Sequence, residues 1–158
     1  SQSKIEEATR TRQARFDYAL SQVEDEIIEQ IQFLRSTGVK TVLVSNASSG
    51  EVAAWKDSPL ADCFDEVIFS FECGMAKPDP GIYQLALEKL GVTADKTLFV
   101  GDGGSQEHEG ARAAGLSPVL MKKFTCDSLS EEELRLRAMF ADYEIHQLHD
   151  LQPIVHIM

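Results

Sequence analysis

Two short polar segments could bind a phosphoryl or carboxylate group. Ser45 and Asn46 follow the apolar run VKTVLVS, and they offer a hydroxyl, an amide and backbone N–H groups that can hold such an oxygen. Further along, Lys77 supplies a cation. Pro78 and Pro80 follow it and restrict the local backbone, which helps to hold the ammonium group in place.

A third segment adds two carboxylates. Asp102 ends the run TLFVGD, and Glu107 lies five residues further on. Gly103 and Gly104 between them allow the backbone to turn closely around whatever these acids bind. Two carboxylates on one loop, together with Lys77, are suited to a hard cation and a phosphate.

These segments need a framework of strands and helices. Short apolar, β-branched runs predict buried strands over residues 39–45, 66–71, 97–100 and 118–121. Between and before them, apolar spacing and glycine stops predict helices over residues 16–36, 51–56, 82–90 and 106–114. Strands that alternate with helices predict an α/β fold, a doubly wound, Rossmann-like parallel sheet, with ligands at the carboxyl ends of its strands.

The two ends of the sequence give weaker patterns. Residues 5–18 are charged and predicted helical, without a clean apolar face. Ser130 and Glu133 form a capping-box pattern that predicts a helix start, whereas residues 142–158 alternate only weakly.

The composition excludes several classes of protein. The 158 residues include 26 acidic and 15 basic ones, for a net charge of -11, which disfavours nucleic acid as a partner. No apolar run approaches the roughly 20 residues that span a membrane, and no apolar signal core follows the first residues. We expect no membrane partner and a cytoplasmic protein. Cys63, Cys73 and Cys126 favour neither a disulfide framework nor a zinc site.

Other residues that could suggest chemistry are better explained by structure. We expect His108, at a helix start, to face solvent, and Asp79, between two prolines, to be a turn residue. The remaining histidines have no motif context, and we expect surface or packing positions for His146, His149 and His156. Three aromatic residues are predicted to lie in the core: Trp55, Phe69 and Phe71. The glycines of residues 101–104 complete no nucleotide-binding fingerprint.

Three of these segments resemble the motifs of one family. VLVSN is similar to the second motif of haloacid dehalogenase (HAD) superfamily hydrolases, GMAKPDPGIYQLALEKLG to the third, and TLFVGDGGSQEHEGARAAG to the fourth, in the family's order and spacing. The resemblance implies that Ser45 and Asn46 bind the phosphoryl group and that Lys77 neutralises the nucleophile and the transferred group. It also implies that Asp102 and Glu107 hold Mg²⁺ and that the substrate is a small phosphorylated metabolite.

The sequence departs from the family pattern in two places. The pair Gln106-Glu107 stands where the family more usually has Asn-Asp. The family's first motif, an Asp-x-Asp that supplies the nucleophile and the general acid, is absent from these 158 residues. We therefore expect a fragment that begins in the family's helical cap, with a cap remnant over residues 1–20, an α/β core over residues 21–158 and no central first strand. The gap predicts self-association or association with a missing N-terminal segment.

The resemblance implies a cap-bearing, magnesium-dependent phosphatase that works through an aspartyl-phosphate intermediate, here without its nucleophile. Two alternatives stay open. One is a metal-free haloacid dehalogenase of the same fold, and the other is a non-catalytic HAD-like binding or scaffolding protein.

Overall fold

The computed structural model describes residues 2–123, 125 and 129–156, and it divides the chain into two compact units, Ser1–Glu72 and Cys73–Met158. The predicted division at residue 20 stays a prediction. Of the cysteines, Cys63 is a buried thiol, Cys73 is half-buried, and Cys126 lies outside the described residues.

The first unit begins with two helices, α1 (Gln2–Ser21) and α2 (Asp25–Ser36), so the single helix predicted over residues 16–36 is wrong. Between them Glu24 has an extended backbone, with φ -62° and ψ 131°. The hydroxyl of the buried Ser58 donates a hydrogen bond of 2.7 Å to the Leu20 carbonyl, which satisfies a carbonyl left unpaired at the end of α1. This tertiary contact is invisible in the apolar spacing that suggested one helix.

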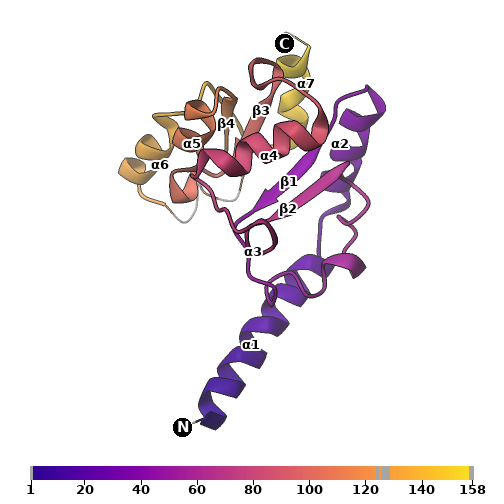
Figure 1. Ribbon diagram of the computed structural model, residues 1–158, viewed down its shortest axis with the longest axis vertical. Coiled ribbons are helices and arrows are strands. Elements are labelled where there is room, and N and C mark those ends of the chain that lie inside the picture. Colours follow the sequence, from indigo (N-terminus) through magenta and orange to yellow (C-terminus); the bar gives the residue numbers. More distant parts are fainter. Residues whose placement is uncertain (1, 124, 126–128, 157–158) are drawn as a thin grey trace. The chain divides into compact units, whose positions relative to one another are not determined.

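Two parallel strands follow, β1 (Val42–Ser45) and β2 (Glu66–Phe69), with Ser45 opposite Phe69 (Figure 1). The predicted strand over residues 66–71 ends early, because α3 (Ser70–Cys73) begins there. Residues 51–54 form turns, and the 3-10 helix η1 (Trp55–Asp57) follows them, so the helix predicted over residues 51–56 is wrong.

Burial in this unit differs from the prediction at three places. Trp55, predicted to lie in the core, is half-buried. All four residues of β1 are half-buried, although we expected a buried strand. Phe69 is buried and Trp55 lies edge-on to it, with 5.6 Å between ring centroids, but Phe71 is 45% exposed and not a core residue.

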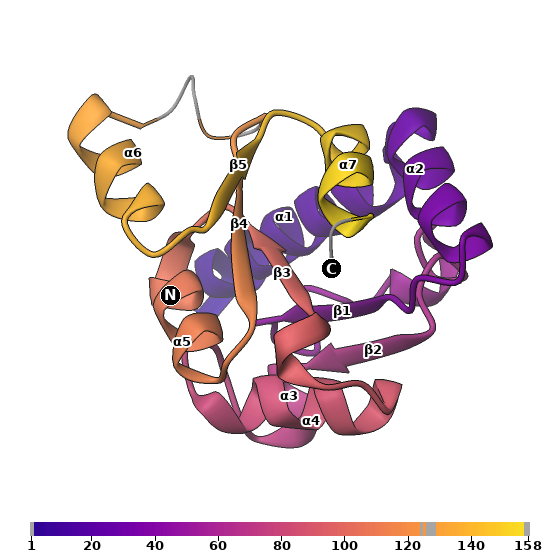
Figure 2. The same cartoon turned by 90° about the horizontal axis from the view of Figure 1, so that it is seen from above.

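The second unit contains a three-stranded parallel sheet in the order β3-β4-β5 (Figure 2). Its strands are β3 (Leu98–Gly101), β4 (Ser117–Met121) and β5 (Tyr143–Ile145). The helices are α4 (Pro80–Leu90), α5 (Glu107–Ala113), α6 (Glu131–Ala138) and α7 (Leu151–Val155). Three 3-10 helices complete it: η2 (Ala94–Lys96), η3 (Gly104–Gln106) and η4 (Leu148–Asp150). The helices and strands predicted over residues 82–121 are confirmed, with shifted ends.

Local sequence explains where the helices of this unit begin and end. Asp79 caps α4, since its carboxylate accepts a hydrogen bond of 2.7 Å from the Gly81 N–H, and Gly91 ends that helix in a left-handed conformation. The predicted capping box of Ser130 and Glu133 starts α6. The buried centre of the unit lies where α4 and α5 meet β3 and β4, and its most buried apolar residues are Ile82, Tyr83, Ala111, Val119 and Leu120.

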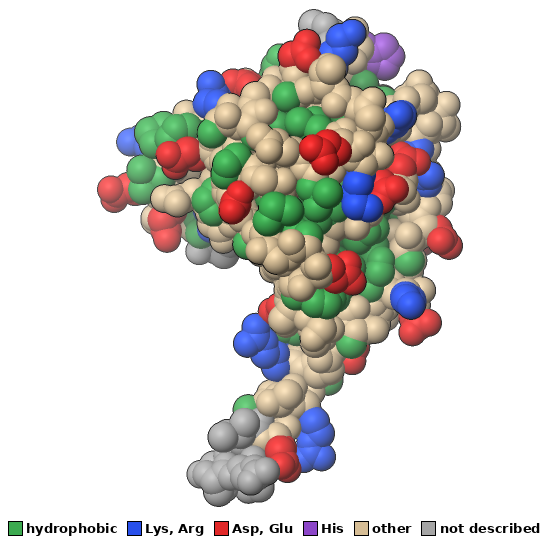
Figure 3. All heavy atoms as spheres, viewed as in Figure 1, with side chains coloured by type: hydrophobic (Ala, Val, Ile, Leu, Met, Phe, Trp, Pro, Cys, Tyr) green, Lys and Arg blue, Asp and Glu red, His purple; other side chains and the backbone are tan. Residues whose placement is uncertain are grey.

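The protein therefore has an α/β fold with parallel sheets, as predicted, but the described residues form two sheets where one doubly wound sheet was expected. No helix among the described residues is long and apolar enough to span a membrane. Acidic and basic side chains are mixed on the face drawn in Figure 3.

Asp65 ties the start of β1 to α2 in the first unit. Its carboxylate accepts hydrogen bonds from the Thr41 N–H (2.7 Å) and from the Arg35 guanidinium (2.8 Å). The Thr41 N–H, and after it Arg35, outweigh the effect of burial and hold the pKa of Asp65 below its ordinary value of 3.8.

Replacement of this carboxylate should destabilise the protein only where the carboxylate is ionised. Because the folded pKa is depressed, its contribution is present above the ordinary pKa and is lost as the pH falls through the folded value. Asp65→Asn should lower the melting temperature by about 2–4 °C at pH 7, and the difference should shrink below pH ~3.8. Thermal unfolding monitored by circular dichroism tests this, with the exposed Asp57→Asn as control. An equal loss for Asp65→Asn at pH 7 and pH 3 would contradict the assignment.

Candidate functional site

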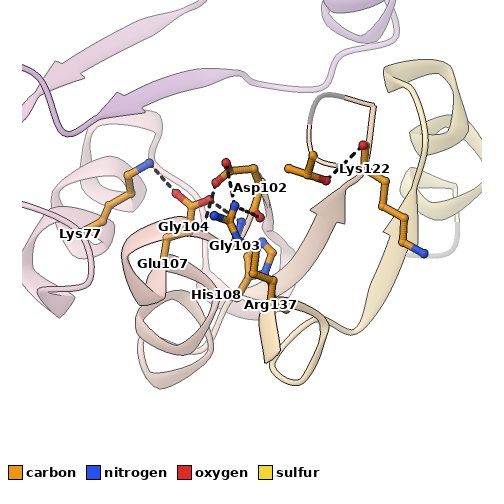
Figure 4. Close-up of polar contacts among 9 residues, drawn as sticks. Lys77, Asp102, Gly103, Gly104, Glu107, His108, Lys122 and Arg137 are labelled. Atoms are coloured by element: carbon orange, nitrogen blue, oxygen red, sulfur yellow. Dashed lines mark hydrogen bonds and ion pairs between the residues drawn. The ribbon is translucent and has the colours of Figure 1, made fainter. Parts of the chain in front are cut away.

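A buried ion pair lies at the centre of the candidate site. The Lys77 Nζ is 2.7 Å from the Glu107 Oε2, and the two side chains are only 13% and 7% exposed (Figure 4). The same ammonium lies 5.5 Å from the centre of the Phe99 ring, a distance at which the ring face attracts a cation. Low exposure strengthens both interactions relative to a surface pair.

Glu107 is held on every side. The Gly103 N–H donates to its Oε1 at 3.0 Å, and the Tyr83 hydroxyl donates to its carbonyl at 2.8 Å. Burial, together with the nearby Glu107 charge, raises the pKa of Tyr83, so the hydroxyl keeps its proton at neutral pH. Gly101 leaves room for the long acid, since a Cβ there would lie 2.2 Å from Oε1.

The segment that carries Lys77 is packed as tightly. A Cβ at Gly110 of α5 would lie 2.6 Å from the Pro78 carbonyl oxygen, so only glycine allows the helix to approach this backbone. On the other side Asp79 caps α4. The residues that follow Lys77 are therefore packed against α5 and joined to the start of α4.

Asp102 lies directly after β3 and is the exposed member of the site, with 55% of its side chain accessible. Its Oδ1 accepts a hydrogen bond of 2.8 Å from the Gly104 N–H, and its Oδ2 lies 2.9 Å from the Arg137 Nη1. Burial acts to raise the pKa of Asp102, but the Gly104 N–H and the Arg137 guanidinium outweigh it and hold that pKa below the ordinary value. The carboxylate is thus ionised at neutral pH.

Two residues at the site were missed or misjudged. Arg137 of α6 carried no signal in the sequence, because an arginine on a polar helix is ordinarily a solvated charge. His108 is 2% exposed, so the expectation that it faces solvent is wrong. The His108 Nδ1 lies 3.2 Å from the Arg137 carbonyl and must donate to it, because a carbonyl only accepts.

Ser45 and Asn46 belong to the first unit, whereas Lys77, Asp102 and Glu107 lie together in the second. Ser45 is half-buried at the end of β1, and the exposed Asn46 follows it. Both residues therefore stand at a strand end, where the sequence placed them.

The donor chemistry of Asp102 fits a hard cation, because Mg²⁺ binds one or two carboxylates and completes its shell with water and phosphate oxygens. Glu107 is less available, since Lys77 and the Gly103 N–H already engage its two oxygens. Within the described parts of the chain, no three His, Cys, Asp or Glu side chains form a group that could hold a metal. A cation at Asp102 would need ligands from water or from a phosphate.

The sequence match to known proteins now decides the family. A family model described as "haloacid dehalogenase-like hydrolase" matches residues 2–115, and these include all five predicted site residues. The chain belongs to this family. A similar curated relative of the HAD-like hydrolase is a glyceraldehyde 3-phosphate phosphatase of Methanocaldococcus jannaschii, 25% identical over 81% of this chain and 54% of that protein. The chain thus spans about half the length of such relatives.

Two solved HAD structures are similar. A HAD phosphatase from Thermococcus onnurineus shares 30% of its sequence, with a TM-score of 0.70 over 85% of this chain and 58% of that one. An L-2-haloacid dehalogenase from Xanthobacter autotrophicus shares 27%, with a TM-score of 0.63 over 83% of this chain and 60% of that one. The HAD-like fold is common to both, and the family includes phosphatases and dehalogenases.

Gly101 and Glu107 should show a strong energetic coupling. Gly101→Ala should destabilise the protein by about 1–3 kcal/mol, because the new methyl group overlaps the Glu107 carboxylate. Combining it with Glu107→Asp shortens the acid and should recover about 1 kcal/mol of that loss. Urea unfolding of the two single variants and the double variant measures this. Additive effects on the free energy of unfolding would show that the side chains at residues 101 and 107 do not compete for the same space.

His108 should be a structural residue of the second unit. His108→Ala removes a buried ring and its hydrogen bond to Arg137, and should cost about 2–4 kcal/mol of unfolding free energy. The exposed His146→Ala is the matched control and should change stability by less than about 0.5 kcal/mol. Equal stability of both variants in urea unfolding would return His108 to the surface role first expected.

Proposed function

We propose that this chain is the charge-neutralising and metal-holding part of a magnesium-dependent phosphatase for small phosphomonoesters. The buried Lys77–Glu107 pair beside Asp102 is the observation that carries the proposal. Phosphoryl transfer needs little covalent chemistry from the binding groups and depends on positioned charge, which is what this loop supplies.

Lys77 is the proposed catalytic cation. A phosphate monoester carries negative charge that must be offset while a nucleophile approaches. An ammonium held by Glu107 and Phe99 does so with little reorganisation. Glu107 holds Lys77 in this role. It would contribute to a metal through water rather than directly, because both of its oxygens are engaged.

Asp102 is the proposed direct ligand of Mg²⁺, which when bound would offset charge on the phosphoryl oxygens. Ser45 and Asn46 are proposed to bind the phosphoryl group through the hydroxyl, the amide and nearby backbone N–H groups. The similarity to a glyceraldehyde 3-phosphate phosphatase supports a small phosphorylated metabolite as substrate.

The covalent step requires a nucleophile that these 158 residues do not supply in an Asp-x-Asp motif. The first carboxylate of an Asp-x-Asp motif on another segment would attack phosphorus. The bond from phosphorus to the ester oxygen would break as the leaving alcohol takes a proton from the second carboxyl group of that motif. Water would then hydrolyse the aspartyl phosphate to inorganic phosphate and the free carboxylate. Among the described strands, β1 pairs only with β2 and β3 only with β4, so each keeps an edge that another segment or copy can pair with.

Dehalogenation of a small haloacid is the second candidate, and the similarity to an L-2-haloacid dehalogenase favours it. That chemistry needs no metal, whereas Asp102 and the glycine turn after it present an ionised, half-exposed carboxylate suited to one. We therefore favour the phosphatase. Release of chloride from 2-chloropropionate, with no phosphate release under matched conditions, would reverse the choice.

The proposal predicts activity that depends on an added nucleophile. Residues 1–158 alone should release no product from p-nitrophenyl phosphate with Mg²⁺ present. Refolding with a separately made segment that carries an apolar strand ending in Asp-x-Asp should restore turnover. In that reconstituted preparation Lys77→Ala should lower kcat by at least ~100-fold, because the transferred charge loses its counter-ion.

Two controls make this assay decisive. Lys96→Ala removes the same charge from an exposed position of the same unit and should leave turnover unchanged. An Asn-x-Asn version of the added segment should restore nothing. Turnover by the isolated 158-residue chain that is lost in Lys77→Ala would refute the proposal that the nucleophile comes from outside it.

A further inference from the structure

Arg137 of α6 lies against Asp102, the proposed metal ligand. Its Nη1 lies 2.9 Å from the Asp102 Oδ2 and donates to the Asp102 carbonyl, also at 2.9 Å (Figure 4). The guanidinium therefore engages both the side chain and the backbone of the proposed metal ligand. Its own side chain is 25% exposed, so the contact is partly shielded from solvent.

Side chains of helix α5 hold the backbone around Arg137, which itself lies on α6. His108 binds the Arg137 carbonyl at 3.2 Å, and Arg112, one turn further along α5, donates to the Phe140 carbonyl at 3.1 Å. Gly103 completes the contact, since a Cβ there would lie 2.8 Å from the Arg137 Cβ. These contacts hold the backbone around Arg137 against α5 and the Asp102 loop.

Arg137 also lies outside residues 2–115, the part of the chain that matches the family model. The family resemblance therefore did not imply its contact with Asp102.

We propose that Arg137 is an intramolecular competitor for the cation site at Asp102, so that a divalent cation binds only by displacing its guanidinium. The inference rests on the proposed role of Asp102 as a metal ligand. Arg137 neutralises the carboxylate in the absence of metal, and a divalent ion placed on the same oxygen meets a fixed positive charge a few ångströms away. Removal of Arg137 should therefore raise metal affinity, although it removes a stabilising ion pair.

The test measures metal binding to the 158-residue chain, without any activity assay. Mn²⁺ serves as the probe, and its free concentration is followed by electron paramagnetic resonance at constant ionic strength. Arg137→Gln should bind Mn²⁺ about three- to tenfold more tightly than the unmodified chain, and Mg²⁺ should compete with it. Asp102→Asn should abolish this binding in both backgrounds.

Arg135→Gln is the matched control, because it removes the same charge from an exposed position of α6. It should change affinity by less than about 1.5-fold. Arg137→Lys keeps a cation but lacks the guanidinium fork, so its affinity should fall between those of the unmodified chain and Arg137→Gln. If Arg137→Gln fails to fold by circular dichroism, Arg137→Lys carries the comparison.

The outcomes separate this inference from the proposed function. Binding that requires Asp102 but is equal in the unmodified chain and Arg137→Gln overturns the competition and leaves the metal role of Asp102 intact. An equal gain in Arg135→Gln also overturns it, because net charge would then explain the effect. Absence of binding in every variant, or binding that survives Asp102→Asn, overturns both.

Discussion

The second unit is organised around one buried charge pair, that of Lys77 and Glu107. Taking two charges out of water costs free energy. Their mutual attraction offsets this cost only where further contacts hold each charge. The surrounding structure supplies these contacts in the Gly103 N–H, the Phe99 ring and the close packing of Gly110 on Pro78. A Cβ at Gly101 would overlap the Glu107 carboxylate, and a Cβ at Gly110 would overlap Pro78, the residue that follows Lys77.

Because of this pair, Glu107 and Asp102 have different roles in the loop. Glu107, 7% exposed, neutralises Lys77 and is shielded from solvent, while Asp102, 55% exposed, faces outward. Two carboxylates five residues apart therefore meet different surroundings, and only one is accessible to an incoming cation. A lone acid could not both fix the lysine and remain accessible.

The places of these residues in the fold could be predicted from the sequence because the signals are local. Lys77 between α3 and α4, Asp102 after a strand and Gly91 at a helix end each follow from neighbouring residues. The failures came from long-range contacts. Ser58 ends α1 from 38 residues away, His108 is buried under α6, and Arg137 reaches Asp102 across 35 residues. No periodicity within a segment records such partners. Phe71 failed for the complementary reason, since an apolar side chain does not reveal whether anything covers it.

Helix α5 holds the end of α6 through the backbone of α6 and of the residues that follow it. His108 and Arg112 bind backbone carbonyls, at residues 137 and 140, and every amino acid has a carbonyl. The backbone at residue 137, beside Asp102, is therefore held whichever side chain residue 137 carries. A substitution at residue 137 therefore changes the charge beside Asp102 and keeps the backbone contacts that dock the end of α6.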